Sequence, residues 1–241
     1  EYAPGSEVVI DGWTYISSGI TLKSNMGNQS VRNLLRHCTS CGHEMIVQNN
    51  PIQLNNVCPN CENNTLTGIK RETAFSEIIE PVGFAVDLYS DRSRVINEVT
   101  KRNFIEPLLI NVDPWLESSS PVIDYRDSND KAEILYYNPG NGNGFSVCLT
   151  CGKASTNPGD LINHHRLRGG KDDDQNSGMC SGNTNQYAIR DNVLLVGRLQ
   201  TDFFEFRCKN ETGKLINDKA TLYSLAQTIS KNLALVCIIF W

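Results

Sequence analysis

The chain has 241 residues, enough for one large or two small domains and for a hydrophobic core that needs no disulfides. Its 22 Lys and Arg residues against 27 Asp and Glu residues give a formal charge of -5, which excludes a generally basic nucleic-acid-binding coat. The longest apolar run, residues 233–241, is too short to span a bilayer, and the N-terminus lacks the layout of a signal peptide. We therefore expect a soluble, cytoplasmic protein with no membrane segment.

Short runs of alternating or β-branched residues predict strands along most of the chain. They lie at 8–16, 44–48, 78–88, 133–137 and 193–206, and Gly, Pro and Asn clusters separate them. From about Lys219 onwards, apolar residues recur every three or four positions, which predicts an amphipathic helix capped near Asp218.

Two pairs of cysteines in the first half of the chain have the spacing of a metal site. The first pair is Cys38 with Cys41, and the second pair is Cys58 with Cys61. Two residues lie between the cysteines of each pair, and residues 42–57 lie between the two pairs. Two intervening residues let both sulfur atoms point to one side of a tight turn, so two such turns complete a tetrahedron around one ion. The pattern is typical of a zinc ribbon.

A second cluster begins at Cys148 and Cys151, and its remaining ligands must come singly from further along the chain. The available side chains are His164, His165 and Cys180. Spacing does not choose between the two histidines. We expect both on a short helical turn from residue 160, so that only one ring can face the sulfur atoms.

Other uses of these cysteines fit the sequence less well. Nine cysteines without a secretion signal argue against disulfides, and a thioredoxin-like redox pair would occur once rather than twice. A catalytic zinc ion usually has three protein ligands and an open position, whereas each cluster supplies four ligands. We therefore expect two structural zinc ions. The remaining cysteines, Cys208 and Cys237, lie on predicted apolar faces, so we expect them to be core residues and not ligands.

Two further motifs could carry chemistry. The acidic run 172–174 could hold a metal ion for phosphodiester chemistry, but its polar surroundings favour a solvated loop. The glycine-rich run 138–144 lacks the ending of a phosphate-binding loop, so we predict a hairpin turn there. The sequence also has no DEAD or DEAH box to hold magnesium. We therefore expect that this chain alone is not an enzyme and hydrolyses no ATP.

The stretch 112–130, rich in Pro, Ser and Asp, is the predicted linker between two domains. Residues 1–111 would form an N-terminal β-rich zinc-ribbon domain, and residues 131–241 a second zinc-binding α+β domain. The sequence opens at Glu1 without a methionine and ends inside the apolar run, so we expect a fragment truncated at its C-terminus. The predicted fold class is α+β, with small β-sheets, two zinc-ribbon-like sites and a C-terminal amphipathic helix.

Several motifs, taken in order, resemble one protein family. They are EYAPGSEVVIDGWTYISSGI, CTSCG, CPNC, PVGFAVD, GFSVCLTCG, HHRLRGG and LQTDFFEF. Together they resemble the C-terminal zinc-binding region, named after the MrfA DNA-repair helicase, of superfamily 2 DEAD/DEAH-box helicase-like proteins. That family includes proteins of the bacterial DISARM and Druantia anti-phage systems. The resemblance covers nearly the whole chain.

The resemblance implies a role for individual residues. The family's four-cysteine cluster corresponds to the first cluster here, and its later C-x-x-C-G motif to Cys148 and Cys151. The histidine of its H-x-x-L-R segment corresponds to His164, and its lone cysteine to Cys180. The resemblance also implies an upstream helicase core in an ATP-dependent parent protein, and a terminal domain that continues past Trp241.

Two functions follow from these expectations. The resemblance implies a zinc-stabilised accessory module of a DNA-processing protein, in DNA repair or phage defence, that contacts nucleic acid or the helicase core. Basic groups at 70–71, 101–102 and 165–168 are the candidate DNA contacts. The acidic balance favours the alternative, a protein-interaction scaffold that docks a defence-system partner without touching nucleic acid.

Overall fold

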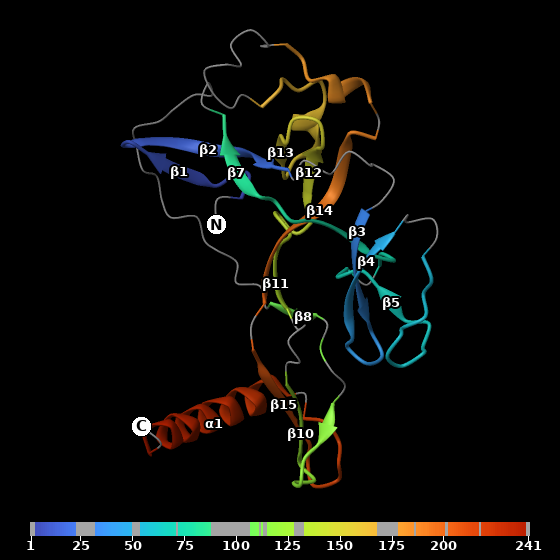
Figure 1. The fold of residues 1–241 in the computed structure, drawn as a ribbon, viewed down its shortest axis with the longest axis vertical. Coiled ribbons are helices and arrows are strands. Elements are labelled where there is room, and N and C mark those ends of the chain that lie inside the picture. The colour runs from blue at the N-terminus through green and yellow to red at the C-terminus, as the bar shows by residue number, and fades with distance from the viewer. Residues whose placement is uncertain are drawn as a thin grey trace. The chain divides into compact units, whose positions relative to one another are not determined.

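The computed structural model describes residues 3–22, 32–49, 54–70, 72–87, 107–110, 112, 115–127, 133–167, 178–185, 187–200, 202–216 and 218–239. Within these ranges the chain is built mainly of β-strands and has one α-helix near its C-terminal end (Figure 1). The predicted α+β composition is confirmed at this level.

The chain forms two compact units that are not consecutive in sequence. The first unit combines Glu1–Asn111 with Glu133–Gln200, and the second combines Val112–Ala132 with Thr201–Trp241. This grouping differs from the expected division into 1–111, 112–130 and 131–241. Strand β14 (Ile189–Gln200) causes the difference, because it pairs in parallel with β6 (Ser76–Ile79) and so joins the sheet of the N-terminal half.

The large sheet of the first unit runs in the order β13-β12-β14-β6-β3-β4, with β11, β8 and β5 paired beside this path. Its other strands are β3 (Arg32–Cys38), β4 (Glu44–Asn49), β5 (Leu66–Thr67), β8 (Leu108–Ile110), β11 (Glu133–Asn138), β12 (Phe145–Cys148) and β13 (Ala154–Ser155). Buried apolar side chains from these strands form two clusters of the core, one around Phe145 and Val193 and one around Leu35 and Leu135. Their burial supplies the main stabilising term of the unit.

The prediction of a hairpin turn at 138–144 is wrong. Strands β11 and β12 both pair antiparallel with β14, β11 with its second half and β12 with its first half. The glycine-rich segment is therefore a loop between two strands that lie end to end along β14 and do not pair with each other. Backbone N–H groups of Gly142 and Gly144 close it by donating to the carbonyl of Pro139.

A smaller sheet of the first unit contains β1 (Glu7–Ile10), β2 (Trp13–Thr21) and β7 (Gly83–Val86). The predicted strand at 8–16 is thus a hairpin, whose turn residues Asp11 and Gly12 have φ values of 50° and 76°. Two successive positive φ values match the right-handed twist of the flanking strands. At its far end β2 meets the second cysteine cluster, since Ile20 N donates to the carbonyl of Gly152 at 2.8 Å.

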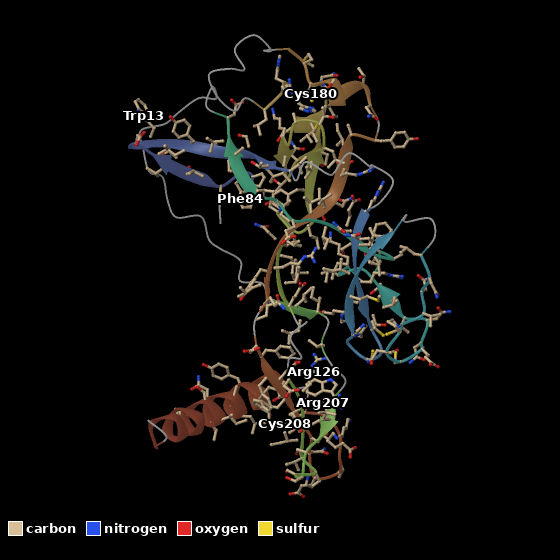
Figure 2. All side chains as sticks on the ribbon, in the orientation of Figure 1. Trp13, Phe84, Arg126, Cys180, Arg207 and Cys208 are labelled. Atoms are coloured by element: carbon tan, nitrogen blue, oxygen red, sulfur yellow. The ribbon has the colours of Figure 1, made fainter. Side chains whose placement is uncertain are left out.

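The second unit contains a three-stranded sheet in the order β15-β10-β9, made of β15 (Phe204–Cys208), β10 (Ile123–Asp127) and β9 (Leu116–Glu117). The segment expected to be a linker therefore contributes two of these strands. Arg126 of β10 and Arg207 of β15 lie close to each other in this unit (Figure 2). Each guanidinium carbon lies over the ring of Trp115, at 4.6 Å from the ring centroid for Arg126 and at 4.5 Å for Arg207. The buried carboxylate of Asp124 accepts hydrogen bonds from Lys209 and Arg207, and these bonds lower its pKa.

The helix α1 (Lys219–Ile239) begins where the sequence predicts. Its cap is Asp218, whose carboxylate accepts from the backbone N–H and the hydroxyl of Thr221. In the described part of the chain no helix is both long and apolar enough to cross a membrane.

Candidate metal centres

The first cluster brings together four sulfur atoms that all lie within 4.8 Å of one another, those of Cys38, Cys41, Cys58 and Cys61. The sulfur atoms of Cys38 and Cys61 are 3.6 Å apart, and those of Cys41 and Cys58 are 3.7 Å apart. A disulfide would need about 2.0 Å. Zinc–sulfur bonds of about 2.3 Å in a tetrahedron place the sulfur atoms about 3.8 Å apart, so the observed spacing would fit a tetrahedral metal ion.

The C-x-x-C turns of the two clusters share one backbone geometry. In each turn the N–H of the first cysteine donates to the carbonyl five residues on, and its own carbonyl accepts from the N–H four residues on. The turns begin at Cys38, Cys58 and Cys148. The residue that follows the second cysteine of each turn has a positive φ, and these residues are Gly42, Glu62 and Gly152. The sequence reveals two of the three positions, because glycine adopts this conformation at low cost.

The second cluster brings Cys148, Cys151, His164 and Cys180 together, with their ligand atoms within 4.8 Å of one another. The sulfur atoms of Cys148 and Cys180 are 3.8 Å apart, and Cys151 Sγ lies 3.5 Å from His164 Nε2. The four side chains come from three segments: the turn between β12 and β13, the chain after the 3-10 helix η2 (Pro158–Leu161), and the residue that caps η4 (Ser181–Thr184).

Local hydrogen bonds fix the orientation of His164. Its Nδ1 lies 2.8 Å from the carbonyl of Leu161, so Nδ1 carries the proton and Nε2 keeps a lone pair toward the sulfur atoms. The side chain of Asn183 holds the backbone of His164 on both sides, accepting from its N–H and donating to its carbonyl. The side chain of His164 is buried, with 3% of its surface exposed, whereas the neighbouring His165 is exposed. The backbone of His165 forms an isolated antiparallel β-bridge with Met179.

The expected helical turn through both histidines is wrong. Helix η2 ends at Leu161, and the chain from His164 to His165 is not helical. Pro158 can start this helix because its missing N–H is not needed in the first turn. The hydrogen bond from His164 Nδ1 to the carbonyl of Leu161 then ties the imidazole to the last residue of the helix.

The thiols of each cluster differ in proton affinity. Burial raises the pKa of Cys58 to about 12, whereas hydrogen bonds from Thr65 and nearby backbone N–H groups outweigh burial at Cys38 and lower its pKa to about 6. In the second cluster a hydrogen bond from Cys151 lowers the pKa of Cys148 to about 4, and the pKa of Cys151 rises. Thiolates this close repel one another, and a bound divalent cation would offset that repulsion.

Donors around the sulfur atoms complete both clusters, and the cysteine spacing gave no sign of them. Asn60 and Asn63 direct their side-chain amides at Cys41 and Cys61, each at 3.5 Å, and the Thr65 hydroxyl lies 3.1 Å from Cys38. In the second cluster Gly182 N donates to Cys180 at 3.4 Å. A Cβ atom at position 182 would lie 2.7 Å from the sulfur of Cys148, so only glycine fits there.

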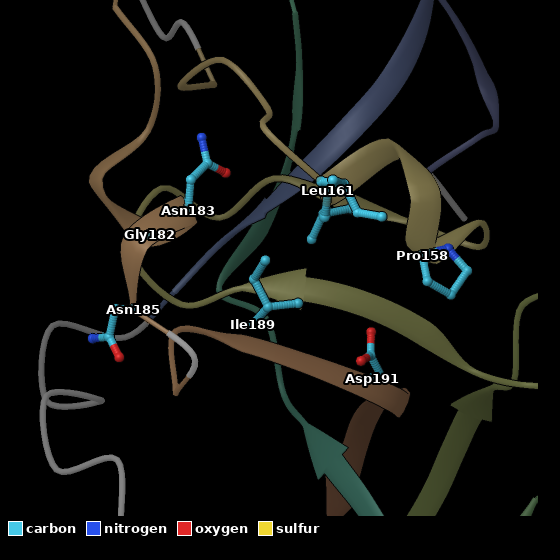
Figure 3. A pocket seen from close by; sticks show the side chains of 8 residues that line it. Pro158, Leu161, Gly182, Asn183, Asn185, Ile189 and Asp191 are labelled. Atoms are coloured by element: carbon cyan, nitrogen blue, oxygen red, sulfur yellow. The ribbon is translucent and has the colours of Figure 1, made fainter.

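A shallow pocket of about 310 Å³ lies beside the second cluster (Figure 3). Leu161 and Ile189 line it and also pack against the cysteines, so the pocket and the cluster share a wall. At one end Asp191 accepts a hydrogen bond from the hydroxyl of Ser146.

Several predicted sites fall on other parts of the chain. The acidic run 172–174, residue 71, the basic pair 101–102 and residue 168 lie outside the described residues, as does the side chain of Cys237. Lys70 donates to the side chain of Asn143, and Arg166 is exposed. Cys208 is half-buried in β15 and is a member of neither cluster.

These features define a mostly β-stranded chain with two cysteine-rich clusters that could each hold a metal ion. No family model and no solved structure matches the chain. Among curated proteins, Druantia protein DruE of Escherichia coli (strain UMEA 4076-1) is 29% identical over 176 residues. The aligned region covers 64% of this chain but only 9% of DruE. The expected similarity to a Druantia protein is thus confirmed at the level of a distant relative.

Proposed function

We propose that the chain is a zinc-stabilised accessory module of a defence-related, helicase-like DNA-processing protein. The observation that carries the proposal is the grouping of four ligand atoms in each cluster, all within 4.8 Å of one another. Four thiolates, or three thiolates and an imidazole, are the donor sets of structural zinc sites. The residues are Cys38, Cys41, Cys58 and Cys61 for one ion, and Cys148, Cys151, His164 and Cys180 for the other.

Both zinc ions have a structural role in this proposal. Catalytic zinc keeps one coordination position for water or substrate, whereas each cluster can fill all four positions with protein ligands. The buried members of each set, such as Cys38 and Cys148 at 0% exposure, support the same role. A cytoplasmic location belongs to the proposal as well, because both centres need reduced thiols.

The defence context comes from the similarity to Druantia protein DruE and from the family motifs. The aligned region spans only 9% of that relative. We therefore propose that any motor activity of a parent protein of this chain would reside in other parts of that parent protein. The chain itself has no phosphate-binding loop and no DEAD or DEAH box, so we propose that it hydrolyses no nucleotide alone. Its own task would be to brace the helicase core or to contact nucleic acid.

The second candidate function is a protein-interaction scaffold that docks a defence-system partner. The formal charge of -5 favours it, because the tetrathiolate and trithiolate centres would add about three further negative charges once zinc is bound. An acidic surface repels the phosphate backbone unless local basic groups offset it.

The salt dependence of DNA binding distinguishes the two functions. If the chain contacts phosphates, log affinity for a fluorescent single-stranded oligonucleotide should fall by roughly 0.7 per log unit of salt for each phosphate engaged. Fluorescence anisotropy between low and physiological salt measures this slope. Arg166→Ala, which removes an exposed basic side chain, should flatten it. Binding that is absent, or that does not change with salt, would favour the scaffold.

A pair of histidine variants tests the second centre. His164→Ala should leave one zinc ion per chain, because it removes the buried imidazole that faces Cys151. His165→Ala is the matched control and should keep two, since its ring is exposed. Elemental analysis of both purified variants gives the count. The reverse outcome would show that the ligand assignment is off by one residue.

A further inference from the structure

Arg36 is the largest fully buried side chain described, with 2% of its surface exposed. It lies in β3, two residues before Cys38. Side chains two residues apart in a strand point to the same face, so the guanidinium group and the Cys38 thiol share one side of the sheet. A buried cation next to a candidate metal ligand calls for a physical reason, since burying an arginine is costly.

The guanidinium group holds the segment that carries Cys58 and Cys61. Its Nη1 donates to the carbonyl of Asn55, and its Nη2 donates to the side chain of Asn56 at 2.7 Å and to the carbonyl of Leu66 at 3.0 Å. The first two acceptors precede Cys58 in sequence, and Leu66 follows Cys61. Arg36 therefore fastens both ends of the second C-x-x-C turn to the strand that supplies Cys38.

Within the described part of the chain, the acceptors that Arg36 bonds are all neutral oxygens. The remaining one is the carbonyl of Ala74, at 3.1 Å from Nε. Arg190, another buried arginine of the same sheet, instead has the carboxylate of Glu77 at 3.6 Å. A tetrathiolate zinc centre carries a net charge of about −2. That centre would give the guanidinium group the counter-charge that its hydrogen-bond acceptors do not supply.

We propose that Arg36 is the positioning residue and counter-charge of the first metal centre. It fixes the Cys58–Cys61 turn at the correct distance from Cys38 and Cys41, and it offsets the negative charge of the four thiolates. This inference rests on the proposed function, in which the first cluster binds zinc. A planar fork with five donors is needed for the first task and a positive charge for the second.

The test measures zinc release from the whole chain with a chromophoric chelator. Two centres should release zinc in two kinetic phases. The phase that is absent in His164→Ala is assigned to the second centre, and the phase that remains is assigned to the first. Arg36→Gln, which removes both the charge and the fork, should release zinc from the first centre about 10–100-fold faster. Arg36→Lys keeps the charge but not the fork, so its release rate should be intermediate.

Arg32→Met is the matched control, because Arg32 lies on the same strand and face but pairs with Glu77 at 3.0 Å. It should leave the rate of the first phase unchanged. Cobalt-loaded protein adds a readout of the centre's charge. The thiolate-to-cobalt absorption of the first centre should shift in Arg36→Gln and return toward that of the unmodified chain in Arg36→Lys.

Release from Arg36→Gln at the unmodified rate would overturn the inference. Equal release rates and equal cobalt spectra for Arg36→Gln and Arg36→Lys would overturn the counter-charge role. If Arg36→Gln does not fold, Arg36→Lys alone decides, since an unchanged rate in that variant would refute the positioning role. An unmodified chain without zinc in the first cluster is a different result, which would refute the proposed function itself.

Discussion

Replacing Cys58 with serine is expected to release one zinc ion and to unfold the part of the first unit built around β3 and β4. Structural zinc contributes about 10–16 kcal/mol of apparent binding free energy in small zinc fingers, which is as large as the whole net stability of a domain, about 5–15 kcal/mol. Cys58 is 0% exposed, so we expect that a water molecule cannot readily take its place as the fourth zinc ligand. Zinc analysis and chemical denaturation followed by circular dichroism measure both effects.

The matched control for this variant is Cys208→Ser. Cys208 is half-buried in the second unit and belongs to neither cluster, so this change should leave two zinc ions and alter stability by about 1 kcal/mol or less. Two zinc ions and an unchanged unfolding transition in Cys58→Ser would contradict the role given to the first cluster.

The second large effect is expected for Gly152→Ala, at the turn of the second cluster. Gly152 has a φ of 79°, and a Cβ atom there would lie 2.2 Å from the carbonyl oxygen of Ile20. Left-handed backbone costs a residue with a side chain about 1–2 kcal/mol, and overpacking adds about 1–3 kcal/mol. We expect a loss of about 3 kcal/mol or more in the free energy of unfolding, together with detachment of β2 from the cluster.

Gly42→Ala separates the two contributions. Gly42 occupies the same position in the first cluster and has a similar φ of 72°, but no atom lies within 4 Å of its would-be Cβ. This variant should therefore lose only about 1–2 kcal/mol. Hydrogen exchange of the amide of Ile20, which donates to Gly152, reports directly on the contact. Equal losses in the two variants would show that β2 does not pack against the turn.

The structural features that were predicted correctly from the sequence are those that depend on residues close together in the chain. The C-x-x-C turns need only the local spacing of two cysteines, so the six paired cysteines could be proposed before the structure was known. Spacing left His164 and His165 as alternatives, and the family resemblance supplied the choice of His164. The helix α1 follows from a periodic pattern with Asp218 at its start, and β4 and β11 follow from alternating side chains. Each of these features depends on residues that are neighbours in sequence.

Features that depend on distant segments could not be predicted in this way. The parallel pairing of β14 with β6 brings together residues more than a hundred positions apart and regroups the chain into interleaved units. The continuation of β11 into β12 along β14 is of the same kind, and it overrode the turn signal of the glycines. Arg36 shows no motif at all, because its role depends on acceptors up to 38 positions away.

The most direct test of the account is the zinc content of the unmodified chain, purified under reducing conditions without added metal. Native mass spectrometry and elemental analysis of the same sample should give two zinc ions per chain, with the seven cysteines of the two clusters protected from alkylation until a chelator is added. A chain that carries no zinc, or whose cluster cysteines react at once or are joined as disulfides, would contradict the account.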